Sequence, residues 1–144
     1  MKKHICGSLR LRAACILLCL AAVSTFYGCG FSKTSPKMVE KLDYTVVEDE
    51  DVPKELLEMI NAKKENRLKL TYATNEYLYI VTGYGTQETS GYSIRLDNLY
   101  MGENAIYIQT SLIGPRKNEN ITKVKTYPYM VVKIEHREEP VIFE

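Results

Sequence analysis

Short apolar runs separated by polar turns fill the second half of the chain, and they limit the folds that it can adopt. Residues 67–72 alternate polar with apolar side chains, and this period of two predicts a half-buried strand. Residues 77–82 follow a turn-like tetrapeptide, so the two runs together predict a β-hairpin. Asp97 and Asn98 predict a turn or bulge. Further strands are predicted for residues 92–96, 99–101, 105–112 and 129–134, with an edge strand at 141–143.

Residues 53–64 have the period of a helix instead. A first helical turn tolerates the proline at its start, and the apolar side chains recur three and four residues apart. The acidic run 48–51 precedes this segment, where carboxylates face the positive end of the helix dipole. We therefore predict an α+β, mainly β domain, with one N-terminal helix packed on a small antiparallel sandwich or barrel of six or seven strands.

The first 28 residues differ in composition from the rest of the chain. Four basic residues and no acidic residue precede an uncharged run of 15 residues, 13–27. A basic start, a short apolar core and a small residue at the exit predict a secretory signal peptide. An uncleaved membrane anchor is the alternative, although a spanning helix needs about 20 apolar residues.

The end of this run, Phe26-Tyr27-Gly28-Cys29, resembles the lipobox of bacterial lipoproteins. Gly28 and Cys29 match that pattern, whereas Phe26 and Tyr27 replace the usual leucine and small residue. The resemblance implies that residues 1–28 are removed, that Cys29 is lipidated, and that the protein is held at the extracytoplasmic face of the bacterial cell membrane. Ordinary secretion, with cleavage near Ala21 and Ala22, is the alternative.

Three segments of the chain follow from this interpretation. Residues 1–28 are a lipoprotein signal peptide, residues 29–43 are the lipidated cysteine with a flexible tether, and residues 44–144 are the β-rich domain. All four cysteines lie at or before Cys29, so the exported domain must fold by its core, without disulfides.

The exported part has few groups suited to catalysis. His4 would leave with the signal peptide, and His136 lies in a charged segment that is typical of a surface. A serine or cysteine nucleophile would therefore lack an orienting base, and the carboxylates do not show the spacing of an acid/base pair. Metal-ligand clusters, phosphate-binding glycine loops and basic stripes are also missing from the sequence. We expect a non-enzymatic protein with no cofactor, no metal and no nucleic-acid partner.

A polar loop bracketed by glycines, residues 85–92, is the candidate site for binding a partner protein. Glycine adopts backbone angles that other residues avoid, and small hydroxyl residues let a partner's backbone approach closely. The candidate contacts are Gly85, Thr86, Thr89, Ser90, Gly91 and Tyr92. A loop that only closes a hairpin would need the same glycines, so that alternative stays open.

Pro128 is a second position of structural interest. It stands between Tyr127 and Tyr129, and aromatic neighbours favour the cis form of a peptide bond to proline.

Two segments resemble the PrcB C-terminal domain family. Residues 82–94 are similar to its strand, small residues and Thr-Gly-Gly-Tyr-x-Ile segment, with Ser90 where glycine is common. Residues 127–134 resemble its closing Pro-Tyr-x-x-Val-Lys strand, and the likeness spans roughly residues 52–134. The resemblance implies a surface lipoprotein subunit or regulator of a secreted protease complex, whose partner is a secreted or surface protease.

The loop also has a shorter likeness to another family. Thr89-Ser90-Gly91-Tyr92 is similar to part of the Asn-Pro-Thr-Thr-Gly-Tyr loop of chagasin-type protease inhibitors, but this chain lacks the Asn-Pro. That likeness implies a direct peptidase inhibitor. An envelope structural or ligand-binding module unrelated to proteases is the third hypothesis.

Overall fold

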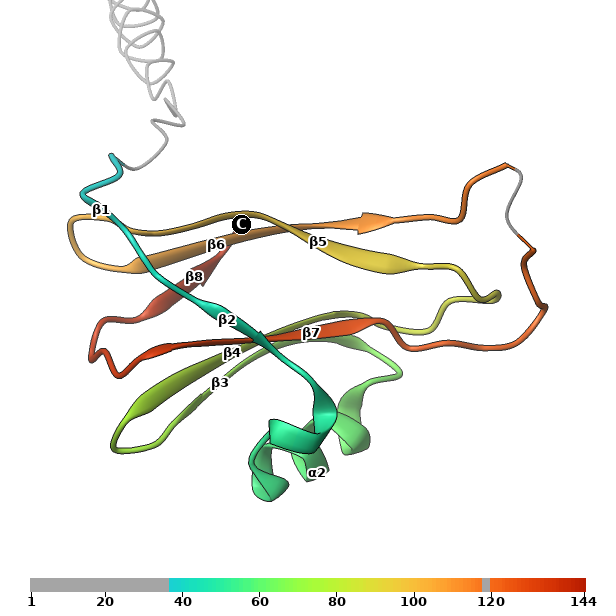
Figure 1. Cartoon of the computed structure of the whole chain (residues 1–144), viewed down its shortest axis with the longest axis horizontal. Helices are drawn as coiled ribbons and strands as arrows, with labels where there is room; N and C mark the ends of the chain where they lie inside the picture. Colours follow the sequence, from blue (N-terminus) through green and yellow to red (C-terminus); the bar gives the residue numbers. More distant parts are fainter. Residues whose placement is uncertain (1–36, 118–119) are drawn as a thin grey trace, which may run out of the picture. The chain divides into compact units, whose positions relative to one another are not determined.

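Two sheets of four strands face each other in the computed structural model, which describes residues 37–117 and 120–144 (Figure 1). The predicted signal peptide and Cys29 lie outside the described residues. The first sheet, sheet A, has the strand order β1 (Glu40–Lys41), β5 (Ser93–Met101), β6 (Ile106–Ile113), β8 (Val141–Phe143). The second sheet, sheet B, has the order β2 (Thr45–Val47), β7 (Tyr129–Glu135), β4 (Tyr77–Tyr84), β3 (Arg67–Ala73). The prediction of an α+β, mainly β domain is confirmed, and the strands form a sandwich rather than a closed barrel.

The interior between the sheets follows from the alternation of side chains along the strands. Leu78 and Ile80 of β4 join a core cluster with residues of sheet A, such as Leu99 and Ile108. The intervening Tyr79 and Val81 belong to a second cluster on the other face of sheet B. Because successive side chains of a strand point to opposite faces, β4 is buried on both sides and is the centre of the domain.

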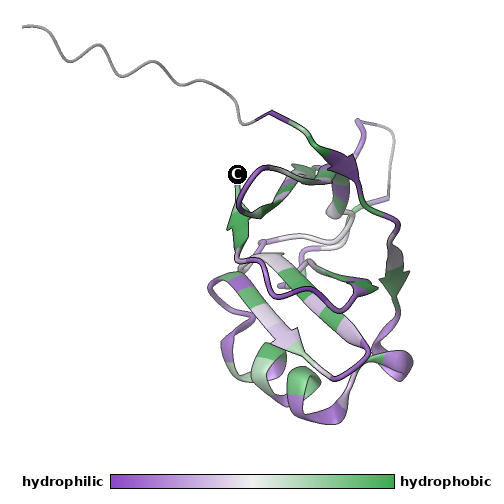
Figure 2. Ribbon diagram, turned by 90° about the vertical axis from the view of Figure 1, so that its left-hand side faces the viewer, coloured by the Kyte–Doolittle hydropathy of each residue, from purple (hydrophilic) through white to green (hydrophobic). Residues whose placement is uncertain are grey.

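The helix α2 (Lys54–Lys63) covers the outer face of sheet B. Its residues Leu56 and Ile60, four apart on one face, are 0% exposed and pack with Val81 and Val131. Figure 2 shows the bands of hydrophobic and hydrophilic residues that this pattern produces along helix and strands. Pro53 is the N-terminal cap, and no side chain caps the helix, so the acidic residues before it do not hydrogen-bond its end.

The segment before the helix crosses from one sheet to the other, diagonally in Figure 1. β1 pairs with Tyr100 and Met101 of β5, and only four residues after Lys41 the chain pairs with β7 through Thr45. Leu42, within this crossing, is 4% exposed and belongs to the inter-sheet core. The folded domain therefore begins before residue 44, and residues 40–42 are not part of a tether as predicted.

The strands also show how well local patterns predicted their details. The β3–β4 hairpin is present, and the register of β5 against β6 shifts between Leu96 and Asn98, which confirms the bulge predicted there. The predicted edge strand at the C-terminus is β8, and it pairs with β6 in parallel.

His136 links the end of β7 to the turn between β3 and β4. Its Nδ1 lies 2.6 Å from the carbonyl oxygen of Thr74, and its Nε2 lies 3.2 Å from Oε1 of Glu138. Both partners are acceptors, so the doubly protonated ring satisfies both contacts. The hydrogen bond to Glu138 and that to Thr74 accordingly raise the pKa of His136.

This raised pKa predicts a pH dependence of stability. The contribution of His136 to the stability of the fold is fully present below the ordinary imidazole pKa of 6.5. It is lost as the pH rises through the higher pKa that His136 has in the folded state. Thermal unfolding of the wild type and of His136→Gln should therefore show a larger difference in Tm at about pH 5 than at about pH 8. A difference that does not change with pH would mean that the charged ring contributes nothing.

Candidate partner-binding face

The loop of residues 85–92 has the backbone geometry that its glycines predict. Gly85 has φ of 73° and Gly91 has φ of 88°, and both values are in the region that favours glycine. A Cβ atom on Gly85 would lie 3.0 Å from the carbonyl oxygen of Glu65, and one on Gly91 would lie 2.8 Å from Cβ of Pro115. Backbone angle and close packing therefore both require glycine at these two positions.

The loop is joined to a segment more than thirty residues later, 121–128. Gln87 and Thr126 exchange two backbone hydrogen bonds, of 2.8 and 3.0 Å. Ser90 donates its N–H to the carbonyl of Thr122 over 3.0 Å, and its Oγ accepts the N–H of Thr122 over 2.9 Å. The hydroxyl of Thr126 donates to the carbonyl of Thr89 over 2.8 Å. These two stretches, which we call the loop pair, therefore form one hydrogen-bonded end of the sandwich.

The predicted contact residues consequently lie in different surroundings. Gly85 is buried, and the hydroxyl of Thr86 donates to the carbonyl of Glu65 over 3.1 Å. The hydroxyl of Ser90 is likewise used within the loop pair, so these polar groups order the loop. Gly91 is exposed, as is Glu88, which the sequence analysis did not select. Tyr92 is half-buried and lies at the border of a groove.

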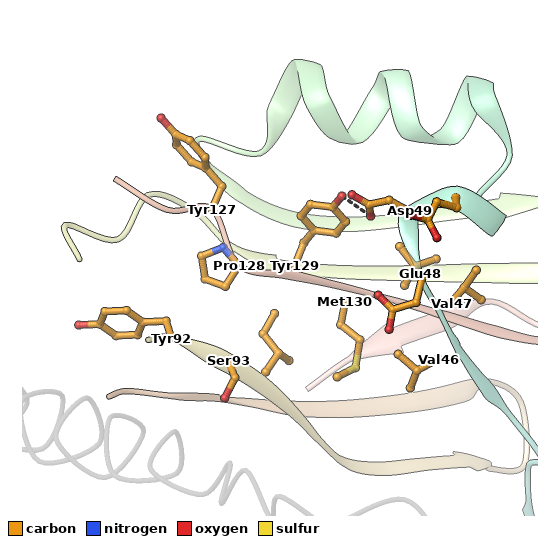
Figure 3. Close-up of a pocket in the computed structure, with 13 residues that line it drawn as sticks. Val46, Val47, Glu48, Asp49, Tyr92, Ser93, Tyr127, Pro128, Tyr129 and Met130 are labelled. Atoms are coloured by element: carbon orange, nitrogen blue, oxygen red, sulfur yellow. Dashed lines mark hydrogen bonds between the residues drawn. The ribbon is translucent and has the colours of Figure 1, made fainter. Parts of the chain in front are cut away.

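This groove, about 630 Å³ in volume, opens next to the loop pair (Figure 3). Three parts of the chain line it: the start of β5, the start of β7 with the residues before it, and the end of the crossing segment. The lining residues are Tyr92, Ser93 and Ile94; Tyr127, Pro128, Tyr129, Met130 and Val131; and Val46, Val47, Glu48, Asp49 and Glu50. Of the predicted loop contacts, Tyr92 is the one that lines the groove.

Pro128 lies in the wall of the groove, but its predicted cis peptide bond is wrong. The described residues contain no cis peptide bond, so the bond between Tyr127 and Pro128 is trans. The carbonyl of Pro128 accepts the N–H of Tyr84 over 3.1 Å, which extends the pairing of β4 to the residue before the start of β7. The trans bond thus leads the chain directly from this hydrogen bond into β7.

Comparison with known families decides what kind of domain carries this face. Residues 78–135 match the family described as PrcB C-terminal. We call these matched residues the PrcB C-terminal segment. The resemblance noted in the sequence is thereby confirmed, and the match relates the protein to protease complexes. No curated protein and no solved structure matches the chain.

The PrcB C-terminal segment supplies most, but not all, of the face. It contains the loop pair, β5 and the start of β7. The acidic wall at residues 48–50 lies outside the match and comes from the stretch before the helix. The protein therefore adds charge to one side of a groove whose other sides belong to the family segment.

The acidic wall is anchored to the PrcB C-terminal segment by one hydrogen bond. The hydroxyl of Tyr129 donates to Oδ1 of Asp49 over 2.5 Å (Figure 3). Burial of the ring, together with this bond to the carboxylate, raises the pKa of Tyr129 well above its ordinary value. Glu48 and Glu50 are exposed, and no ion pair to either is found among the described residues. The groove therefore has two available carboxylates at its border.

The described residues also bear on other kinds of site. They contain no group of three or more His, Cys, Asp or Glu side chains placed to hold a metal ion. They also contain no helix that is long and apolar enough to cross a membrane.

Proposed function

We propose that the protein is a non-enzymatic, lipid-anchored subunit or regulator of a secreted protease complex, and that it binds its protease partner through the loop pair and the groove. The match of residues 78–135 to the PrcB C-terminal family carries the proposal, since the matched residues build most of this face. Tyr92, Tyr127 and Tyr129 at the groove support it, because tyrosine is frequent at the energetically important positions of interfaces.

A direct inhibitor of the chagasin type has less support from the loop geometry. The likeness rests on Thr89, Ser90, Gly91 and Tyr92, and an inhibitory loop would have to present its backbone to a protease. The carbonyl of Thr89 and both the N–H and the Oγ of Ser90 are already hydrogen-bonded to residues 122 and 126. A surface that binds alongside the active site of a protease fits this arrangement better than a loop that enters it.

The anchor is part of the same proposal. A lipid on Cys29 would leave residues 30–39 between the membrane surface and β1. Ten residues span at most about 35 Å when fully extended, so the domain would stay close to the membrane and meet partners there.

One experiment tests binding and anchoring together. The full chain with a C-terminal affinity tag is expressed in the bacterium that naturally produces the protein. The tagged protein is then purified separately from the membrane and the soluble fractions. The wild type should be found in the membrane fraction and should enrich a protease or its precursor relative to an unrelated tagged lipoprotein. Cys29→Ala should move the protein to the soluble fraction, because the lipid that would anchor it to the membrane is absent. The captured protease should stay the same.

The two parts of the proposal fail separately. If Cys29→Ala remains in membranes, residues 13–27 are an uncleaved anchor and lipidation is wrong. If neither form enriches a protease, the proposed partner class is wrong.

A further inference from the structure

We infer that the groove is a strand-addition site, in which an extended, basic peptide segment of the partner pairs antiparallel with the free edge of β5. This inference rests on the proposed function, because it states how the partner is held. It follows from three observations on the groove: an unpaired strand edge, an apolar interior and an acidic border.

The unpaired edge is a consequence of the crossing segment. β1 pairs with β5 only at Tyr100 and Met101, after which the chain leaves sheet A and joins sheet B. No described residue makes a backbone hydrogen bond to residues 93–99 of β5 from that side. Every second residue of β5 therefore directs its N–H and C=O away from β6 without a strand partner, which is a template for an added strand.

The bulge in β5 favours a short peptide over a second copy of the chain. The hydroxyl of Ser111 donates to the carboxylate of Asp97, and Arg95 donates to the same carboxylate over 2.6 Å. The hydrogen bond from Ser111 and that from Arg95 both lower the pKa of Asp97. These contacts hold the shifted register at Leu96 and Asn98. Bulges and charged side chains on an edge oppose regular pairing between two long strands, whereas about four residues before the bulge remain straight.

The interior of the groove suits the side chains of an added strand. Successive side chains of a strand point to opposite faces, so every second one would enter the space between the sheets. Ile94 and Met130 line that space, and Val46 at its border is 47% exposed. Apolar residues at alternate positions of the peptide would cover these side chains.

The border determines the charge and direction of the peptide. Three of the thirteen lining residues, Glu48, Asp49 and Glu50, are acidic and none is basic, so a basic residue of the partner is complementary. β1 runs antiparallel to β5, and a peptide in line with β1 would run in the same direction. Its N-terminal end would then lie at the crossing segment, beside Val46 and Glu48 (Figure 3). The basic residue is therefore expected near the N-terminal end of the peptide.

The test uses the purified full chain in detergent and two fluorescent hexapeptides. One probe is Lys-Val-Thr-Val-Thr-Val, and the other has the same residues in reverse order. Anisotropy titrations should show saturable binding of the first probe, at least tenfold tighter than that of the second. Hydrogen exchange should slow at those amides of residues 93–96 that point away from β6 when the first probe is bound, because the backbone of the probe pairs with them.

Matched variants separate the groove from general charge effects. The double variant Glu48→Lys, Glu50→Lys should weaken binding of the first probe at least tenfold. Val46→Trp should weaken it as well, because the larger side chain fills the groove. The pair Glu55→Lys and Glu58→Lys, at exposed positions of α2, changes the net charge equally and should leave binding unchanged.

Three results would overturn the inference. They are the absence of saturable binding, binding that both groove variants leave unchanged, and a concentration-dependent dimer that protects the same β5 amides. Capture of the protease distinguishes failure of the strand-addition inference from failure of the proposed function. If the groove variants still capture the protease, strand addition is wrong and the function stands. If the wild type binds the probe at β5 but captures no protease, the site stands and the proposed partner class is wrong.

Discussion

Replacing Ile80 by alanine should lower the free energy of unfolding by about 2–5 kcal/mol. Ile80 is 0% exposed and lies in the middle of β4, where it pairs with Thr71 on one side and Val132 on the other. Hydrogen bonds to both neighbouring strands hold the backbone, so the sheets cannot move together to fill the cavity. Urea unfolding followed by circular dichroism measures the loss.

Ile142→Ala is the matched control for this prediction. Ile142 is 42% exposed at the edge of sheet A, and its truncation removes the same atoms without leaving a closed cavity. We expect a loss below about 1 kcal/mol. Equal losses for the two variants would mean that the space between the sheets is not the main core of the domain.

Elements with a strong local pattern were predictable from the sequence. The helix has Leu56 and Ile60 four residues apart, and this spacing predicts an apolar face that another element must cover, here sheet B. The bulge at Asp97 was equally visible, because two consecutive polar residues interrupt the alternation of polar and apolar side chains. In each case the residues that determine the structure are neighbours in the sequence.

The crossing segment could not be predicted, because its structure depends on distant partners. Leu42 is a single apolar residue among charged ones and has no period, yet it is buried because the chain passes between the edges of the two sheets at that point. The parallel pairing of β8 with β6 likewise depends on where the final loop returns, and an apolar tripeptide does not specify the direction of its pairing.

The candidate site was predictable in part for the same reason. The glycines of the loop follow from their local context, and both have positive φ. The groove results from segments far apart in the sequence, as in the contact of Asp49 with Tyr129, 80 residues later. The acidic run was assigned to the helix end because that was its nearest neighbour, whereas its observed side-chain contact is with β7.

Replacing Gly91 by alanine should lower the free energy of unfolding by about 1–3 kcal/mol, because φ of 88° is strained for a residue with a Cβ atom. That atom would also lie 2.8 Å from Cβ of Pro115, so the loop or the chain at Pro115 would have to shift. Gly114→Ala is the control, since its Cβ would meet only Tyr92 Cε1 at 3.6 Å, an ordinary contact. Equal unfolding free energies for the two variants would contradict the prediction. Protease capture by the Gly91 variant then separates the two roles of the loop: a loop that only closes the sandwich loses stability alone, whereas a recognition loop also loses its partner at temperatures where the variant is folded.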